Sequence, residues 1–400
     1  MISVAEAGHL ILEHAKPVGV ESVALLEANG RILREDLRAD RDFPPFDRIT
    51  MDGIGICYAD YAAGLRHFPI DGVQAAGAIR LQLKPGHCLE VMTGAMLPEG
   101  VDTVVPYEGL SISDGVAQII HEHYVGPDKN IHRKGSDRSK GDTILNAGRK
   151  MSPAEIGAAA TVGATPVLVS KKLRIAVISS GDELVAVEAT PLPHQIRLSN
   201  SYSLHAILGQ WPVELSLHHL PDDPDVIERE LEALLSSKDA IVLSGGVSEG
   251  KFDYIPAALT RLGVKKVFHK VQQRPGKPFW FGQHPGGTAV FAFPGNPVST
   301  FMCCHRYLLP WLRLSLGLPE APVLWARLTR DVSFQPALTY FMQVKLTFSP
   351  DGILLADPLH GHGSGDLANL VDTDAFMELP AVERSDFSAG EAFPVIPFRR

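Results

Sequence analysis

Short apolar runs alternate with segments of helical period between Leu173 and Leu316, and this alternation limits the fold more than any other feature. Strands and helices that alternate in this way are typical of a parallel sheet with helices on both faces, a doubly wound α/β domain. Right-handed crossovers place the turns that follow the strands at one edge of such a sheet, where open α/β sheets bind ligands. We therefore expect a binding site built from these turns.

The stretch Asp239–Asp253, DAIVLSGGVSEGKFD, has the form of a ligand-binding turn. Its apolar start predicts a buried strand, which breaks at Gly245 and Gly246. Glycine lets backbone N–H groups approach a ligand closely, and the Asp253 carboxylate could hold a cation. On local grounds the glycines could equally serve the turn alone, so the hypothesis depends on other loops that converge here.

The other turns expected at this edge carry two kinds of charged side chain. Carboxylates suit magnesium, which takes oxygen ligands, whereas cations around a proline-framed turn suit phosphate or another oxyanion. The spacing matches neither the dinucleotide-binding GxGxxG pattern nor the Walker loop. The residues predicted at this edge are Glu183, Asp222, Asp253, Gly245, Gly246, Lys270, Arg274, Lys277 and the loop Pro294–Ser299.

Four hundred residues exceed what one core usually organises, so several domains are expected. A helix capped by Ser3 and a second short helix that ends at Gly30 should open the chain. Glycine-punctuated β runs predict an inserted β module, and alternating residues near the C-terminus predict a small β barrel or sandwich, of which we expect the barrel. The predicted domains are an elongated, discontinuous N-terminal domain (1–51 and 133–170), the β module (52–132), the α/β domain (171–318) and the barrel (319–400).

Two further segments have unusual composition. The double proline of Asp40–Asp52 is typical of a rigid, specific loop, although a domain linker is about as good an interpretation on local grounds. The segment Asn130–Asp142 concentrates charges, for which a solvated loop is the ordinary explanation.

A formal net charge of -9 argues against broad binding to nucleic acid or to an anionic membrane. The four cysteines have neither zinc spacing nor a disulfide framework, which fits a reducing compartment. The sequence has no signal peptide pattern and no apolar stretch of membrane-spanning length. We therefore expect a soluble, cytoplasmic protein.

Seven motifs in these loops occur in the order found in one family. The sequence resembles the molybdopterin molybdenumtransferases, which include MoeA and the gephyrin E domain, and the resemblance covers nearly the whole chain. The motifs are PPFDRITMDG (44–53), VMTGAMLPEGVDTVV (91–105), NIHRKGSD (130–137), SSGDEL (179–184), SGGVSEGKFDY (244–254), RPGKP (274–278) and FPGNPVS (293–299).

The resemblance implies insertion of molybdate into the dithiolene of molybdopterin, with adenylylated molybdopterin as substrate, AMP as product and Mg²⁺ or a similar ion as cofactor. It also implies a homodimer whose site is shared between the α/β domain of one subunit and the N-terminal region of the other. The molybdopterin adenylyltransferase is a possible further partner.

The family motifs also assign roles to residues of this chain. Glu183 and Asp253 are implied as metal ligands. The implied catalytic residues are Asp52, Thr93, Asp137, Glu183, Asp222 and Asp253. The implied substrate-binding residues are Gly245, Gly246, Ser248, Lys270, Arg274, Lys277, Pro294, Asn296, Ser364 and Arg48.

Two positions depart from the family pattern. Arg48 stands in a loop that usually has small polar residues, and Gln343 stands where the C-terminal domain usually has an arginine, which Arg48 could replace. A molybdopterin adenylyltransferase, or a binding protein that has lost its chemistry, are the alternative interpretations.

Overall fold

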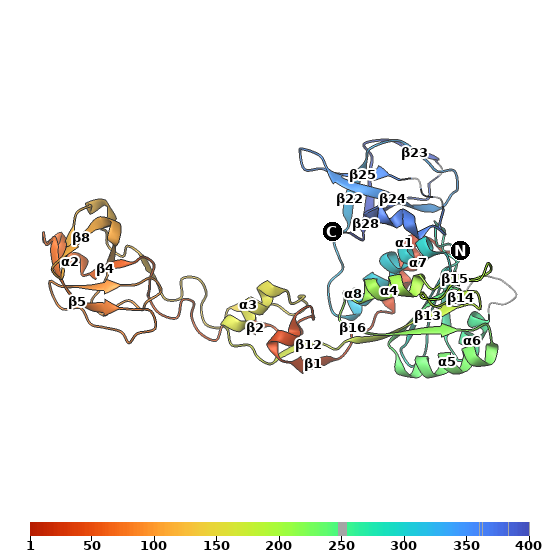
Figure 1. Ribbon diagram of the computed structural model, residues 1–400, viewed down its shortest axis with the longest axis horizontal. Helices are drawn as coiled ribbons and strands as arrows, with labels where there is room; N and C mark the ends of the chain where they lie inside the picture. The colour runs from red at the N-terminus through yellow and green to blue at the C-terminus, as the bar shows by residue number, and fades with distance from the viewer. Residues whose placement is uncertain (247–253, 360, 362, 383, 400) are drawn as a thin grey trace. The chain divides into compact units, whose positions relative to one another are not determined.

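The computed structural model describes residues 1–246, 254–359, 361, 363–382 and 384–399 (Figure 1). The predicted site residues Ser248 and Asp253 therefore lie outside the described residues. Two compact units divide the chain. Unit 1 contains Met1–Arg34, Gly148–Ser152 and Pro166–Arg400, and unit 2 contains Glu35–Ala147 and Pro153–Thr165. The domain boundaries given above stay predictions, as does the elongated form of the N-terminal domain.

A six-stranded sheet forms the centre of unit 1, with the order β16-β13-β17-β21-β20-β18. The first four strands are parallel, whereas β20 pairs antiparallel with both of its neighbours. No helix lies between β18 and β20, and a parallel pair would need a longer crossover connection. The strands are β13 (Leu173–Ser180), β16 (Val213–Leu220), β17 (Ala240–Ser244), β18 (Lys265–His269), β20 (Trp280–Gln283) and β21 (Ala289–Phe293).

Helices cover both faces of this sheet, which confirms the doubly wound α/β domain (Figure 1). Successive strand residues point to opposite faces, so Ile175 and Val177 join one core while Ala176 and Ile178 join the other. On the first face lie α1 (Val4–Glu13), α4 (Asn200–Leu208), α7 (Pro297–Cys303), the π-helical turn η4 (Cys304–Leu308) and α8 (Leu309–Ser315), and on the second lie α5 (Pro224–Ser237) and α6 (Ile255–Arg261).

The start of the chain belongs to unit 1, because α1 buries Val4, Ala7 and Ile11 in the first core. Ser3 caps this helix, with its Oγ accepting from the Glu6 N–H at 3.1 Å. The second expected helix is only a short 3₁₀ helix, although Gly30 follows it with the expected positive φ, at +77°. This helix is η1 (Leu25–Ala28), and the strand β1 (Val20–Val23), which pairs with β12 (Val167–Ser170), precedes it. Pairing with a strand distant in sequence thus determines β1.

The C-terminal part of unit 1 is a closed five-stranded barrel, as expected. The order β24-β25-β22-β28-β26 closes through pairing of β26 with β24. A short strand of the α/β domain, β19 (Gln273–Arg274), adds to β24. The barrel strands are β22 (Leu324–Leu328), β24 (Thr339–Phe348), β25 (Leu354–Pro358), β26 (Ala375–Leu379) and β28 (Ala392–Pro397).

Unit 2 contains the expected β module, a six-stranded sheet with the order β7-β4-β6-β5-β9-β8. Two short strand pairs follow it, β3 (Arg48–Ile49) with β10 (Ile131–His132) and β2 (Leu37–Arg38) with β11 (Thr143–Leu145). Two helices, α2 (Tyr58–Ala62) and α3 (Pro153–Thr161), complete the unit. The sheet strands are β4 (Gly53–Ile56), β5 (His67–Gln74), β6 (Cys88–Val91), β7 (Thr103–Pro106), β8 (Leu110–Ser113) and β9 (Val116–Ile119).

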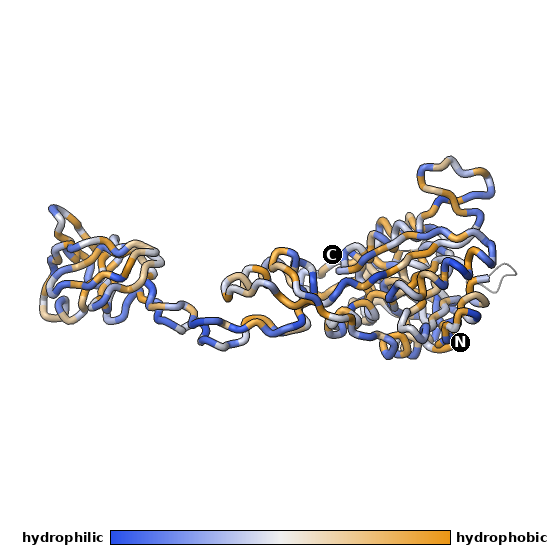
Figure 2. The backbone as a smooth tube through the Cα atoms, turned by 90° about the horizontal axis from the view of Figure 1, so that it is seen from below, coloured by the Kyte–Doolittle hydropathy of each residue, from blue (hydrophilic) through white to orange (hydrophobic). Residues whose placement is uncertain are grey.

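Hydrophobic stretches of the chain are short and are interrupted by hydrophilic ones (Figure 2). Every helix within the described ranges is too short or too polar for a membrane span. All four cysteines are described, and all are free thiols.

Candidate active site

The parallel strands of the α/β domain end together, and we call this side of the sheet the carboxyl edge. Ser180 at the end of β13 is in register with Leu220 at the end of β16, and Ser244 at the end of β17 is in register with Phe293 at the end of β21. The chain enters a turn directly after each of these strands. The sequence prediction that these turns converge is therefore confirmed.

The turn after β13 places Glu183 over its own backbone. Gly181 has a φ of +136°, and a Cβ on it would lie 2.3 Å from Oε2 of Glu183. Only glycine leaves room for the carboxylate in this position. On the neighbouring turn, the backbone N–H of Asp222 donates to Oδ1 of Asp182 at 3.1 Å. The edge thus gathers Glu183 and Asp222 at the ends of two adjacent strands.

Gly245 and Gly246 let the turn after β17 approach its neighbours closely. The Gly245 N–H donates to the Phe293 carbonyl at 3.2 Å, and a Cβ on Gly246 would lie 2.5 Å from Cδ1 of Ile255. Both glycines have a positive φ, at +95° and +68°. The turn is therefore fixed by close contact as well as by conformation.

Asn200 joins two of these turns, and the sequence did not mark it as a site residue. Its Nδ2 donates to Oγ of Ser244 at 2.8 Å and to the carbonyl of Gly295 at 2.7 Å. Its Oδ1 is buried and has no hydrogen-bond partner within the described part of the chain. An asparagine at the first position of α4, the helix that follows β13 after the short strands β14 (Leu184–Val185) and β15 (Ile196–Arg197), was the available signal.

The loop between β18 and β20 carries the predicted cations. Lys270 has a φ of +72°, and its N–H donates to the Phe279 carbonyl at 2.9 Å, so the loop closes on itself. Because β18 runs parallel to β21, this loop also lies at the carboxyl edge. Arg274 and Lys277 are exposed. Burial raises the pKa of Tyr340, and the charge of Arg274 opposes this increase.

Asn296 and Ser364 come together, although Ser364 lies in the C-terminal region. Nδ2 of Asn296 donates to Oγ of Ser364 at 2.9 Å, and the Val298 N–H donates to the Ser364 carbonyl at 3.0 Å. Pro294, the first residue of this turn, accepts at its carbonyl from Oγ1 of Thr300 at 2.5 Å. The start of α7 is thus connected to the segment that follows the barrel strand β25.

In unit 2, Asp52 and Thr93 are in direct contact. The Thr93 backbone N–H donates to Oδ1 of Asp52 at 2.6 Å. This bond, with a second one from the Thr93 hydroxyl, holds the pKa of the Asp52 carboxyl below its ordinary value. The carboxylate is therefore ionised and is held at the end of β6.

Arg48 and Asp137 are connected through a histidine that the sequence did not mark. Nη2 of Arg48 lies 3.1 Å from Nδ1 of His132, and Nε2 of His132 lies 2.8 Å from Oδ1 of Asp137. Arg133 pairs with Asp47 and Asp128, and Nη1 of Arg138 donates to the backbone carbonyl of Asp137 at 3.0 Å, so among the described residues the Asp137 carboxylate is paired with His132 and not with an arginine.

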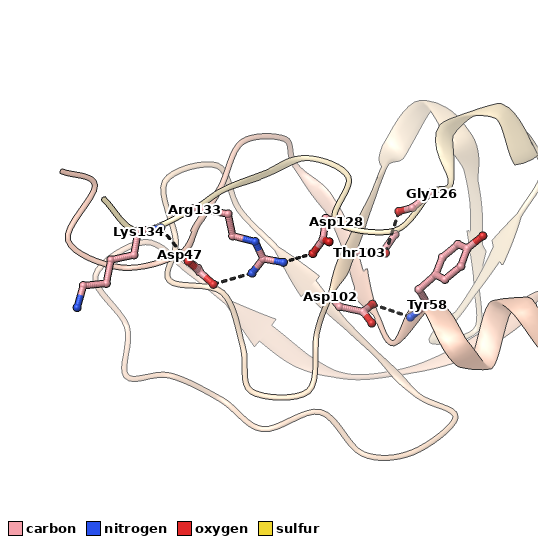
Figure 3. Close-up of polar contacts among 8 residues, drawn as sticks. All are labelled: Asp47, Tyr58, Asp102, Thr103, Gly126, Asp128, Arg133 and Lys134. Carbon is pink, nitrogen blue, oxygen red and sulfur yellow. Dashed lines mark hydrogen bonds and ion pairs between the residues drawn. The ribbon is translucent and has the colours of Figure 1, made fainter. Parts of the chain in front are cut away.

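The segments Asp42–Asp52 and Asn130–Asp142, here called the loop pair, bind each other through side chains and backbone. Figure 3 shows Arg133 between Asp47 and Asp128, with Nη1 of Arg133 2.6 Å from Asp47. Burial raises the pKa of Asp47, but the Lys134 N–H and Arg133 outweigh it, so the pKa lies below its ordinary value. Such contacts are expected for a rigid loop, and the role of the proline-rich segment stays a prediction.

The described residues supply some of the ligands that the implied magnesium ion would need. Carboxylate oxygens are suitable ligands, and Mg²⁺ is commonly held by one or two carboxylates together with substrate phosphates. Glu183, which occupies the space that a Cβ on Gly181 would fill, is such a donor. Among the residues that the structure describes, no group of three or more potential ligands occurs, and Asp253 is outside them.

Gln343 has a buried Oε1 that has no partner within the described ranges. Arg48 is bound to His132 in unit 2. The proposal that Arg48 replaces the arginine of the family stays a prediction.

Family models match most of the chain. They describe the MoeA N-terminal region (domain I and II) over residues 2–163, a probable molybdopterin binding domain over residues 176–314 and the MoeA C-terminal region (domain IV) over residues 325–398.

Curated relatives and solved structures agree with these matches. The molybdopterin molybdenumtransferase of Synechocystis sp. is 41% identical over 397 residues, which is 98% of this chain and 99% of the relative. That of Bacillus subtilis is 30% identical and covers 100% of this chain and 94% of the relative. A crystal structure of the molybdopterin biosynthesis MoeA protein from Pyrococcus horikosii superimposes with a TM-score of 0.83, at 27% identity, over 100% of both chains.

Proposed function

The chain belongs to the molybdopterin molybdenumtransferase family, enzymes that insert molybdenum into molybdopterin, and from this premise we propose that its substrate is adenylylated molybdopterin and that it releases AMP. The observation that carries the proposal is the carboxyl edge. Four turns follow parallel strands there, and a loop with three cations lies beside them. This combination suits a phosphorylated ligand with a nucleotide part.

Each group of residues has a part in the proposed reaction. The exposed side chains of Arg274 and Lys277, with Lys270, bind the phosphate oxygens and offset their charge. The turn at Gly245 and Gly246 offers a backbone surface for close contact. Glu183, with Asp253, would hold a magnesium ion, which when bound withdraws charge from the phosphate oxygens.

The proposed chemistry balances without an oxidant. Addition of one water across the phosphoanhydride bond of adenylylated molybdopterin gives AMP and molybdopterin, which keeps its own phosphate group. Each dithiolene thiol that bonds to molybdenum loses its proton, and the two protons leave with one molybdate oxygen as water. Carboxylates such as Asp52 and Asp137 are suitable acceptors for these protons in transit.

The experiment measures AMP release from adenylylated molybdopterin with molybdate and magnesium. We expect Glu183→Ala to lower kcat by about a hundredfold or more, because loss of a group that offsets developing charge costs this much. Asp239→Asn is the matched control, since Asp239 lies at the opposite end of β17, where it pairs with Arg174 at 2.9 Å. Unchanged rates in Glu183→Ala, or no AMP from the native chain, would contradict the proposal.

We also propose a homodimer whose active site takes residues from both subunits. The support is that the predicted site residues fall into two sets, one in unit 1 and one in unit 2. Mixing Glu183→Ala chains with Asp137→Asn chains should restore about a quarter of native activity, because half of randomly formed dimers are mixed and each has one intact site. A mixture as inactive as its components would contradict a shared site.

The remaining expectations extend this proposal. The cytoplasm is the proposed location, supported by the four free cysteines. The molybdopterin adenylyltransferase is the proposed source of substrate, because its product is the adenylylated molybdopterin consumed here.

A further inference from the structure

We infer that His132 is a positioning residue for Asp137 and that Arg48 holds it in a single tautomer. No family motif assigned a role to this histidine. The positioning role rests on the proposed function, whereas the tautomer of His132 follows from the contacts alone. All three side chains belong to unit 2.

Backbone register brings Arg48 and His132 together. Strands β3 and β10 are antiparallel, and Arg48 is directly opposite His132, just as Ile49 is opposite Ile131. Side chains of directly opposed residues lie on the same face and in contact. The two residues are 84 positions apart in sequence, so the strand pair alone creates this contact.

The chemistry of arginine then fixes the histidine. A guanidinium group has five N–H donors and no acceptor, so Nδ1 of His132, 3.1 Å from Nη2 of Arg48, must present its lone pair. In the neutral ring the proton is therefore on Nε2. That N–H donates to Oδ1 of Asp137 at 2.8 Å. A proton on Nδ1 would face the N–H of Arg48, so Arg48 disfavours the other neutral tautomer.

Asp137 is consequently held at one oxygen and open at the other. Its Oδ1 accepts from His132 and, at 3.4 Å, from Oγ of Ser136, while its backbone N–H donates to the Phe43 carbonyl at 2.9 Å. Within the described ranges, Oδ2 accepts no hydrogen bond. The Asp137 side chain is 54% exposed and His132 is 29% exposed. The arrangement leaves Oδ2 of an exposed side chain available to accept a proton or a hydrogen bond from substrate.

The tautomer is tested on the full-length protein without substrate, by NMR of ¹⁵N-labelled histidine side chains. His132→Gln identifies the signals of His132 by their absence. We expect the native chain to show protonated Nε2 and unprotonated Nδ1, and Arg48→Met to give a mixture of both neutral tautomers. A native ring protonated on Nδ1, or the same spectrum with and without Arg48, would overturn the inference.

The positioning role is tested by the kinetics of AMP release. His132→Leu removes both contacts and should lower kcat about tenfold, a loss typical of groups that orient a functional side chain, with little change in KM. His132→Gln keeps an acceptor for Arg48 and a donor for Asp137, so it should stay within about threefold of the native kcat. Equal kcat in the native and His132→Leu chains, or equal loss in both variants, would overturn the role.

The two tests separate this inference from the proposed function. If the native chain releases no AMP, the proposed function fails while the NMR result still decides the tautomer. If AMP is released and His132→Leu is fully active, only the positioning role fails.

Discussion

The candidate residues of the α/β domain lie on turns whose positions follow from backbone register, whereas most of those of unit 2 lie on two loops that polar side chains help to hold together. At the carboxyl edge, four parallel strands end in line, and glycines allow close contact between turns. In the loop pair, Arg133 connects to Asp47 and His132 connects to Arg48. We therefore expect added side-chain atoms to disrupt the carboxyl edge, and removal of single polar groups to weaken the loop pair.

The largest effect is expected where a methyl group would enter the carboxyl edge. Gly246→Ala should lower the free energy of unfolding by about 3 kcal/mol, because it combines a positive φ with a Cβ 2.5 Å from Ile255. Gly263→Ala is the matched control, since Gly263 has a φ of +80° and open space around it, so its cost should be about 1 kcal/mol. Denaturant unfolding measures both. Equal losses would mean that crowding at the edge contributes nothing.

Acid should weaken unit 1 before it weakens the loop pair. Burial lowers the pKa of His305 from 6.5 to about 4, so the unfolded chain binds a proton first and stability falls as the pH drops through this window. The pKa of Asp47 lies below its ordinary 3.8, so its stabilisation persists above that pH and is lost only as the pH falls through the folded value.

The His305 contribution is measured with His305→Phe, because Nε2 of His305 is buried without a partner in the described part of the chain and its ring packs 4.7 Å from that of Phe301. Relative to this variant, the native chain should lose about 2 kcal/mol of unfolding free energy between pH 6.5 and pH 4. Parallel pH curves for the two chains would show that His305 titrates normally.

A smaller effect is expected from the loop pair. Asp47→Ala removes the bonds from Arg133 and from the Lys134 N–H, and should cost about 1 kcal/mol, since the groups are partly exposed. Asp47→Asn keeps an acceptor for the Lys134 N–H and should lose less. Hydrogen exchange at Lys134 measures the local opening. Faster exchange in both variants to the same extent would show that the charge of Asp47, and not its acceptor, holds the loops.

The smallest effect is expected for Ser364→Ala. The variant loses the bond from Asn296, but the backbone carbonyl of residue 364 still accepts from the Val298 N–H, so the unfolding free energy should change by less than about 1 kcal/mol. AMP release is the sensitive measurement, because Ser364 is also a predicted substrate-binding residue. A loss of unfolding free energy as large as that of Gly246→Ala would show that the Ser364 side chain is needed for the stability of the carboxyl edge.

The sequence predicted the edge well because its signals are local. An apolar run, a glycine and a carboxylate occur within a few residues at Glu183 and at Gly245, and the strand rhythm places such turns together. Asn200 was not predicted as a site residue because its partners, Ser244 and Gly295, are 44 and 95 positions away in sequence. His132 was not predicted for a similar reason, since only the register of β3 with β10 brings it to Arg48. The strand β1 was not predicted because its partner, β12, is also distant in sequence.

The pairing of β19 with β24 has a consequence for exchanging parts between relatives. Gln273 and Arg274 extend the barrel by one strand, so the RPGKP loop shares backbone hydrogen bonds with the C-terminal region. A chimera joined near residue 318 would pair the RPGKP loop of one relative with the barrel of another, although the two form backbone hydrogen bonds with each other. A transplanted barrel should therefore carry residues 272–278 of its own parent, although these lie in another segment of the chain.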